Sequence, residues 1–235
     1  MRRPYPYPRI IAHRCGGVLA PENSLAGLAA AARIGCRGVE FDTMLSADGV
    51  PVVMHDETVD RTTDGRGMVA ALTVAELRRL HLGGEPVPLL VDALAHCAKR
   101  GLWANVELKP PAGGEAELGR VAGQILAARW NGHGVVSSFS TEALVAARHL
   151  APELNYALLV EGLPVDWRER VRRVHATAVH AAASRMTDAA LVAVQADGLM
   201  LACYTVNRRA DAERLLARGV AVFTDRPDLW QPDEM

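Results

Sequence analysis

Apolar and polar positions alternate along this chain with two periods, and the pattern switches between short β-rich runs and longer helical stretches. The clearest β-rich run covers residues 38–45, and a second apolar run at residues 50–56 follows an Asp-Gly pair at 48–49. Two apolar runs joined by Asp-Gly are a strong signal of a β-hairpin. With a two-residue loop, the register would place Asp42 opposite His55.

Strands that alternate with helices fill the rest of the chain. Besides the hairpin, strands are expected at residues 9–12, 103–108, 135–139, 156–160, 177–182, 200–206 and 220–224. Helices are expected from the opening at 21–24 to about 34, at 89–100, 115–130, 141–150, 165–173, 187–196 and 209–217, with a small helix after Thr73. Without the return strand of the hairpin, eight strands alternate with helices, which is typical of a (β/α)8 barrel.

The predicted fold is therefore an α/β TIM barrel with a β-hairpin and a short insertion after strand two, as one domain over residues 1–235. The alternative is an open doubly wound sheet. Polar residues at the carboxyl ends of several strands favour the barrel, and no glycine-rich dinucleotide-binding loop follows the first strand.

Composition and charge limit the partners of this chain. Half of the residues are hydrophobic, the net charge is −1 and the isoelectric point lies near 6.7. Neither nucleic acid nor a membrane surface is expected as a partner, because both attract basic proteins. Residues 1–8 lack the apolar stretch of a signal peptide, and no run is long enough to span a membrane. We expect a cytoplasmic protein, whose oligomeric state the sequence leaves open.

Alternation along the hairpin gathers ionisable side chains on one face. Glu40, Asp42 and His55 are expected to share this face, whereas Val39 and Phe41 are expected to be buried on the opposite one. Burying carboxylates without a partner is unfavourable. A hard divalent cation, which prefers oxygen ligands, is the expected partner.

A barrel brings the carboxyl ends of its other strands to the same mouth. The first strand ends at His13 and Arg14, and the third contributes Glu107 and Lys109. A third carboxylate completes a set that suits Mg²⁺ or Ca²⁺, whereas structural zinc favours cysteine and histidine. The predicted cation ligands are Glu40, Asp42 and Glu107.

Two histidines beside such a cation are what the cleavage of a phosphodiester needs. One of His13 and His55 can deprotonate the attacking hydroxyl, while the other protonates the leaving oxygen. Arg14, Lys109 and the cation would neutralise the phosphoryl charge. Only two of the 26 lysine and arginine residues are lysines. A lysine kept against this bias, such as Lys109, is expected to be needed as a lysine.

Each of these residues also has a plainer interpretation. A single histidine at a strand end is often structural, and Glu107 with Lys109 would form an ordinary surface ion pair. The turn at residues 60–65 is expected to be a plain turn, with lining of the mouth as its weaker interpretation, and the other six histidines are expected to be structural or exposed. The seven candidate residues nevertheless lie at the ends of neighbouring predicted strands, which favours one shared site.

The same positions resemble the motifs of the glycerophosphodiester phosphodiesterases. The matching motifs are His13-Arg14 with Pro21-Glu22-Asn23-Ser24, Glu40-Phe41-Asp42, His55-Asp56, Asp60-Arg61-Thr62-Thr63, Glu107-Leu108-Lys109, Tyr204-Thr205-Val206-Asn207 and Thr224-Asp225-Arg226-Pro227. They span about residues 10–228 in the family's order, and the likeness is greatest to the short cytosolic bacterial enzymes.

The resemblance implies a barrel enzyme with a divalent metal ion, Mg²⁺ or Ca²⁺, at Glu40, Asp42 and Glu107 and with two catalytic histidines at His13 and His55. It implies a small-molecule substrate, a glycerophosphodiester, which is hydrolysed to sn-glycerol 3-phosphate and an alcohol. In this family the glycerol hydroxyl would attack first and give a cyclic phosphate. The resemblance thus implies a role in glycerol and lipid metabolism.

Two positions depart from the family's pattern. Tyr204 stands where many relatives have tryptophan, which keeps an aromatic wall for the substrate, and Cys15 replaces the glycine after His-Arg. The insertion after His55 is short, so the preferred head-group alcohol stays open. Two other hypotheses also stay open. One is a lysophospholipase D-type phosphodiesterase or a phospholipase of the related phosphoinositide type, and the other is a catalytically silent barrel that binds a phosphorylated ligand.

Overall fold

The computed structural model describes residues 7–235. Residues 1–6, which carry most of the segment used to predict the absence of a signal peptide, lie outside the described residues. In the described part of the chain, no helix combines the length and the apolar character needed to cross a bilayer.

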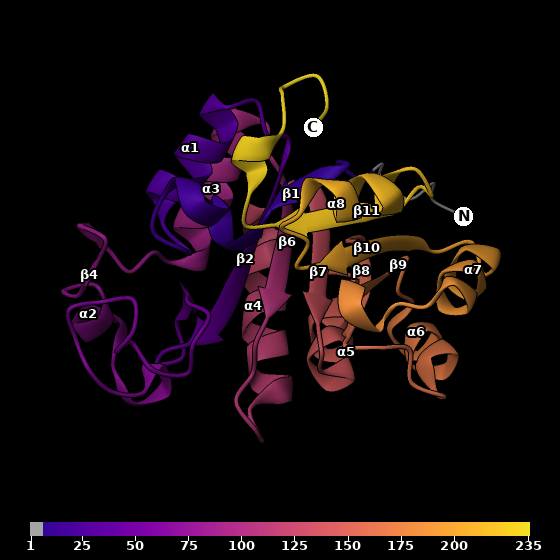
Figure 1. The fold of residues 1–235 in the computed structure, drawn as a ribbon. Helices are drawn as coiled ribbons and strands as arrows, with labels where there is room; N and C mark the ends of the chain where they lie inside the picture. Colours follow the sequence, from indigo (N-terminus) through magenta and orange to yellow (C-terminus); the bar gives the residue numbers. More distant parts are fainter. Residues whose placement is uncertain (1–6) are drawn as a thin grey trace.

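Among residues 7–235, eight parallel strands form a closed ring (Figure 1). The ring runs through β1 (Ile10–Ala12), β2 (Gly38–Leu45), β6 (Trp103–Leu108), β7 (Gly134–Ser138), β8 (Tyr156–Val160), β9 (Ala178–Ala182), β10 (Met200–Tyr204) and β11 (Ala221–Thr224). Pairing of β11 with β1 and of β1 with β2 closes it. The TIM barrel is therefore confirmed, because an open sheet would have two unpaired edges.

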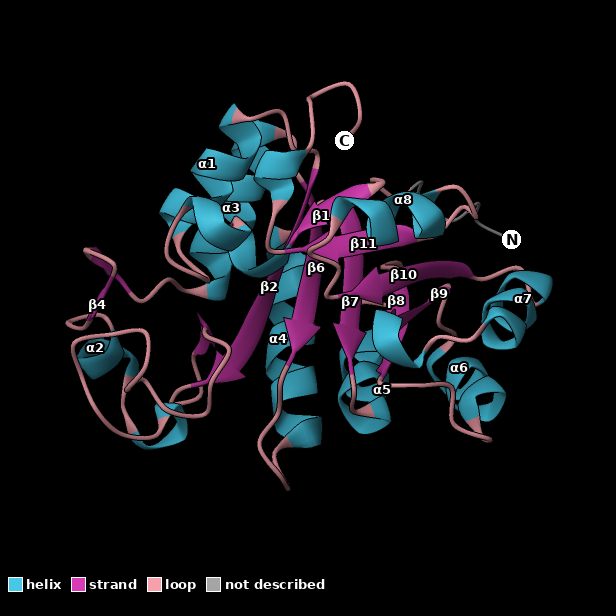
Figure 2. Cartoon of the chain, in the orientation of Figure 1, coloured by secondary structure: helices cyan, strands magenta, loops and turns pink. Residues whose placement is uncertain are grey.

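Helices follow the strands and cover the outside of the ring (Figure 2). They are α1 (Leu25–Arg33), α3 (Leu90–Arg100), α4 (Glu115–Arg129), α5 (Thr141–Leu150), α6 (Trp167–Val174), α7 (Asp188–Ala196) and α8 (Arg209–Leu216). Short 3-10 helices lie at His13–Cys15, Gly17–Leu19, Val69–Ala71, Ala183–Arg185 and Pro227–Leu229. Their ends follow local chemistry, since the Ser24 hydroxyl accepts from the Gly27 amide at the start of α1, and Gly101 ends α3 with φ of 65°.

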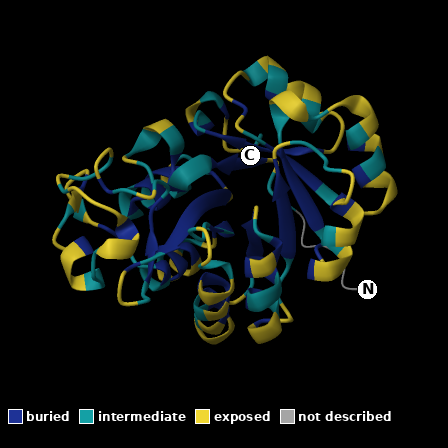
Figure 3. Ribbon diagram, turned by 90° about the horizontal axis from the view of Figure 1, so that it is seen from below, coloured by how far each residue is buried: buried dark blue, intermediate teal, exposed yellow. Residues whose placement is uncertain are grey.

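Two apolar layers flank the strands of the ring, none of whose residues is exposed, and most exposed residues lie on the outer helices and loops (Figure 3). Val39 and Phe41 are fully buried in the layer between the strands and the helices, as expected. A second cluster, which includes Trp103 and Phe223, fills the inside of the ring. Because side chains alternate along β2, Glu40 and Asp42 point to the inside of the barrel.

The predicted insertion after β2 forms a small lobe to one side of the barrel (Figure 1). It contains β3 (Pro51–Val53), α2 (Val74–Leu77), β4 (His81–Leu82) and β5 (Glu85–Pro86). Thr73 and Glu76 form the expected capping box of α2. The lobe has its own apolar cluster, to which Met54 and Leu82 belong.

The predicted register of the hairpin is wrong by one residue. The structure pairs Thr43 with Val53, Met44 with Val52 and Leu45 with Pro51. The Gly49 amide donates to the Ser46 carbonyl over 3.0 Å, and Gly49 has a φ of 74°, so the loop has three residues instead of two. Met54 therefore lies opposite Asp42, to whose carbonyl it donates over 3.1 Å. His55 lies beyond the end of β3, in a loop.

Candidate active site

All eight predicted site residues line one cavity of about 290 Å³ at the carboxyl ends of the strands. They are His13, Arg14, Glu40, Asp42, His55, Glu107, Lys109 and Tyr204. These residues come from both halves of the chain, and the closed ring is what brings them together.

Three carboxylates lie together in this cavity. Glu40 and Asp42 lie on β2, and the Cα partner of Asp42 on β6 is Glu107. An oxygen of each carboxylate lies within 4.8 Å of the other two. Glu40 and Asp42 are buried, and Glu40 Oε1 has no hydrogen-bond partner among the described residues. The donor set is the kind that a hard divalent cation prefers.

Neighbouring groups fix the orientation of two of these carboxylates. The Arg14 amide donates to Glu40 Oε2 over 2.8 Å. Asn23 Nδ2 donates to Asp42 Oδ2 over 2.9 Å, and the Asp42 amide donates back to Asn23 Oδ1 over 3.2 Å. Lys109 Nζ lies 3.7 Å from Asp42 Oδ1. Lys109 is thus paired with Asp42, not with Glu107 as in the plainer interpretation.

Without a cation, the trio is electrostatically unfavourable. Burial, followed by the charge of Asp42, raises the pKa of Glu107 to about 8. The same two causes, with a further contribution from Glu107, hold the pKa of Glu40 well above its ordinary value. The cavity therefore favours either protons or a cation at these oxygens.

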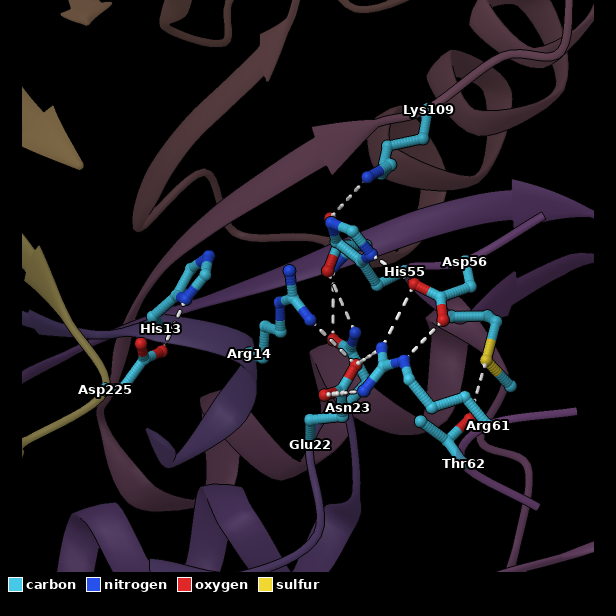
Figure 4. A network of polar contacts seen from close by, with 12 residues as sticks. His13, Arg14, Glu22, Asn23, His55, Asp56, Arg61, Thr62, Lys109 and Asp225 are labelled. Atoms are coloured by element: carbon cyan, nitrogen blue, oxygen red, sulfur yellow. Dashed lines mark hydrogen bonds and ion pairs between the residues drawn. The ribbon is translucent and has the colours of Figure 1, made fainter. Parts of the chain in front are cut away.

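Each candidate catalytic histidine is bound by a carboxylate at Nδ1 (Figure 4). His13 Nδ1 lies 2.7 Å from Asp225 Oδ1, and Asn207 Nδ2 donates to the other oxygen of Asp225 over 2.8 Å. His55 Nδ1 lies 2.7 Å from Asp56 Oδ1. A carboxylate at Nδ1 favours the proton there and leaves Nε2 as the atom that exchanges protons with a substrate.

Arg14 reaches the cavity from a left-handed stretch of backbone. Arg14 and Cys15 have φ angles of 50° and 75°, so the loop does accommodate a side chain at Cys15, where the resemblance implied glycine. Such a conformation costs about 1–3 kcal/mol for a non-glycine residue. Arg14 Nη1 donates to Glu22 Oε1 over 3.0 Å, whereas its Nε has no partner among the described residues. Glu22 thus holds the guanidinium at Nη1, and Nε remains as a hydrogen-bond donor that can bind a ligand.

Tyr204 forms an aromatic wall of the cavity together with Phe139. Their rings meet edge to face, with centroids 6.3 Å apart. The Tyr204 hydroxyl donates to the Val160 carbonyl over 2.8 Å, which fixes the ring. His180, which we expected to be structural or exposed, is fully buried inside the barrel and also lines the cavity. Burial lowers its pKa to about 3, so this imidazole is neutral.

Several residues of the site had no assigned role in the sequence. They are Glu22, Asn23, Asp56, Arg61, Asn207 and Asp225, none of which is part of the cavity lining. Glu22, Asn23, Asp56 and Asp225 contact predicted site residues, whereas Arg61 bonds to Asp56 and Asn207 bonds to Asp225. All of them belong to the motifs that resemble those of the family. This resemblance was the signal in the sequence from which their role in the site could have been found. The turn at residues 60–65 is therefore not a plain turn, since Arg61 bonds to Asp56.

Comparisons with known proteins agree with this geometry. The model of the "Glycerophosphoryl diester phosphodiesterase family" matches residues 13–229. A glycerophosphodiester phosphodiesterase of Caldanaerobacter subterraneus is 31% identical over 233 residues, which cover 93% of this chain and 94% of the relative. The structure of an Oleispira antarctica phosphodiesterase in complex with the product sn-glycerol-3-phosphate superposes with a TM-score of 0.89 at 35% identity, over 94% of each chain.

A second structure supports the same assignment. A protein from Silicibacter pomeroyi described as a putative glycerophosphoryl diester phosphodiesterase has a TM-score of 0.83 at 26% identity, over 94% of this chain and 90% of that one. The family match covers most of the chain and includes every residue of the cavity that we predicted. This chain belongs to the glycerophosphoryl diester phosphodiesterase family and is an enzyme.

Proposed function

We propose that this enzyme hydrolyses glycerophosphodiesters to sn-glycerol 3-phosphate and an alcohol, with the help of a divalent cation and two histidines. The observation that carries the proposal is the convergence of three carboxylates, two carboxylate-bound histidines and two cationic side chains on one cavity. The complex of the Oleispira relative with sn-glycerol-3-phosphate supports the product.

Glu40, Asp42 and Glu107 would hold the cation, because their oxygens lie close enough to share one ion and Glu40 Oε1 has no other partner among the described residues. When bound, Mg²⁺ or Ca²⁺ would polarise the phosphoryl group and lower the pKa of a coordinated hydroxyl. Arg14 and Lys109 bind and orient the phosphoryl oxygens beside it. Tyr204 packs against the substrate and helps to exclude water.

The two histidines divide the proton transfers in this proposal. His13 accepts the proton of the attacking hydroxyl at Nε2, while Asp225 at Nδ1 stabilises the imidazolium that forms. His55 donates a proton from Nε2 to the leaving alcohol, with Asp56 at its Nδ1. The glycerol hydroxyl is proposed as the attacking group, which gives a cyclic phosphate that water then opens.

One assay tests the proposed function. Release of glycerol 3-phosphate from glycerophosphocholine and glycerophosphoethanolamine, each with and without EDTA, is expected to be rapid and sensitive to EDTA. Lysophosphatidylcholine, whose cleavage would release choline and lysophosphatidate, is expected to be a poor substrate when choline release is measured. Preferred cleavage of lysophosphatidylcholine would indicate a lysophospholipase D, and no cleavage of any of the three would indicate a ligand-binding barrel.

The pKa values of the carboxylates predict how pH affects the metal-free protein. Glu107 has a pKa of about 8 in the folded protein against an ordinary value of 4.5, so the folded state binds more protons than the unfolded state between these values. Stability must then fall as pH rises through this window. Glu107→Gln removes the titrating group. We expect the melting temperature of metal-free wild type to fall relative to this variant between pH 5.5 and 8.5.

Added Mg²⁺ or Ca²⁺ should stabilise the wild type more at pH 8.5 than at pH 5.5, because the ion must displace protons. Thermal unfolding in EDTA and in excess cation measures both effects. A constant difference between wild type and Glu107→Gln across the window would show that Glu107 is ionised in the metal-free protein, which contradicts the prediction.

Lys109→Arg is expected to reduce kcat/KM for glycerophosphocholine by roughly tenfold or more, because arginine does not reproduce the point charge of lysine. The longer, planar guanidinium would also press against Asp42, which lies 3.7 Å from Lys109 Nζ. Lys99→Arg, at an exposed position of α3, is the matched control. Equal kinetics for the two variants would reduce Lys109 to a structural partner of Asp42.

A further inference from the structure

His55 lies in a loop, outside the strands of the ring. Strand β3 ends at Val53, so no ladder hydrogen bond with β2 orients His55. Its side chain is 28% exposed and, among the described residues, is held by a hydrogen bond between Nδ1 and Asp56. The orientation of the imidazole therefore depends on where Asp56 is held.

Arg61 holds Asp56 through both carboxylate oxygens (Figure 4). Its Nε donates to Asp56 Oδ2 over 2.6 Å, and its Nη2 donates to Asp56 Oδ1 over 3.0 Å. A bidentate pair of this kind fixes the plane as well as the position of a carboxylate. The hydrogen bonds to Arg61 are also the main cause of the low pKa of Asp56, so this carboxylate is ionised at neutral pH.

Glu22 anchors the other side of the same guanidinium. Arg61 Nη1 and Nη2 donate to the two oxygens of Glu22, each over 2.7 Å. Glu22 belongs to the loop after β1 and also accepts from Arg14 over 3.0 Å. Burial alone would raise the pKa of Glu22, but its contacts with Arg61 and Arg14 outweigh burial and lower it. Arg61 thus ties the loop of His55 to the loop that carries Arg14.

We propose that Arg61 is a positioning residue for catalysis, which orients His55 through Asp56 while Glu22 anchors its guanidinium to the barrel. This inference rests on the proposed function, in which His55 transfers a proton. Arg61 does not line the cavity and its side chain is 50% exposed, so it acts through Asp56 and not on the substrate. Exposed ion pairs add little to folding stability. Loss of Arg61 should therefore affect turnover much more than unfolding.

The test compares Arg61→Gln with Arg66→Gln in the full-length enzyme. Arg66 lies in the same loop, has a side chain that is 90% exposed and forms a weaker pair with Asp60 at 3.7 Å, so it is a matched control. We expect Arg61→Gln to lower kcat for glycerophosphocholine by roughly 10–100-fold with little change in KM, in line with the loss of other groups that orient a functional histidine. Arg66→Gln should stay within about twofold of wild type.

A double variant separates positioning from a general structural effect. If Arg61 acts through His55, adding Arg61→Gln to His55→Ala should cause almost no further loss, because the two residues work as one unit. Multiplied losses in the double variant, or equal kinetics of Arg61→Gln and Arg66→Gln, would overturn the proposal. Wild-type turnover of His55→Ala would instead remove His55 from the mechanism, and the role of Arg61 with it.

Discussion

His13→Ala and His55→Ala are each expected to slow the hydrolysis of glycerophosphocholine by roughly 10²–10⁴-fold, the usual contribution of a positioned proton-transfer group. The imidazoles belong to two different segments, which follow β1 and β3, yet each has a carboxylate 2.7 Å from Nδ1 and lines the same cavity. This arrangement gives one phosphodiester a proton acceptor and a proton donor. Removing either histidine should leave the fold intact, since neither lies in the apolar core.

A substrate with a p-nitrophenol leaving group distinguishes the two roles. This leaving group hardly needs a proton, so the variant that lacks the acid should recover much of its rate on it, whereas the variant that lacks the base stays slow. We expect His55→Ala to recover and His13→Ala not to. The dependence of the rate on pH should lead to the same assignment. His13→Ala should lose the fall in rate at acidic pH, because a base must be deprotonated to act. His55→Ala should lose the fall in rate at alkaline pH, because an acid must be protonated to act.

His149→Ala, at an exposed position near the end of α5, is the control for a histidine without a role in the cavity. It should match wild type on both substrates. Recovery of His13→Ala alone on the activated substrate would reverse the two roles. Unchanged rates for either cavity variant would exclude that histidine from the mechanism.

Exhaustive chelation is expected to reduce turnover to background, and Mg²⁺ or Ca²⁺ should restore it. The physical reason is the carboxylate trio, in which one oxygen of each residue lies within 4.8 Å of the other two and two of the three residues are buried. Glu40→Gln keeps the shape of the side chain but removes one charge, so it should weaken cation binding and lower kcat strongly. The metal-free variant should unfold at a temperature equal to or above that of wild type, because a repelling, buried carboxylate is gone.

Glu40→Gln should therefore weaken cation binding without lowering the melting temperature of the metal-free protein. This combination distinguishes a cation ligand from a structural residue. Isothermal titration with each cation measures binding, and thermal unfolding in EDTA measures stability. Glu117→Gln, on the exposed face of α4, controls for the loss of one negative charge. A Glu40→Gln variant that is less stable without metal but binds the cation as wild type does would make Glu40 structural, and full activity after chelation would reject the metal requirement.

Local pattern in the sequence predicted most of the barrel. The strands at Trp103–Leu108 and Tyr156–Val160 have the expected bounds, and Ser24, Thr73 and Gly101 begin or end helices as their chemistry requires. These features depend on residues within a few positions of one another, and such interactions are encoded locally. The predicted register of the hairpin was wrong because it depends on the length of the loop. The conformation of Gly49 decides between a two-residue and a three-residue loop.

The sequence by itself therefore determined the order of the elements, the alternation that turns Glu40 and Asp42 away from the apolar layer, and the list of residues able to bind a cation or move a proton. Only the tertiary structure decided which of these groups touch. Asp225 reaches His13 across 212 positions of sequence, and Lys109 pairs with Asp42 and not with its near neighbour Glu107. Closure of the ring sets these contacts, since β11 and β6 each join the strands near the N-terminus through pairings that no local pattern specifies.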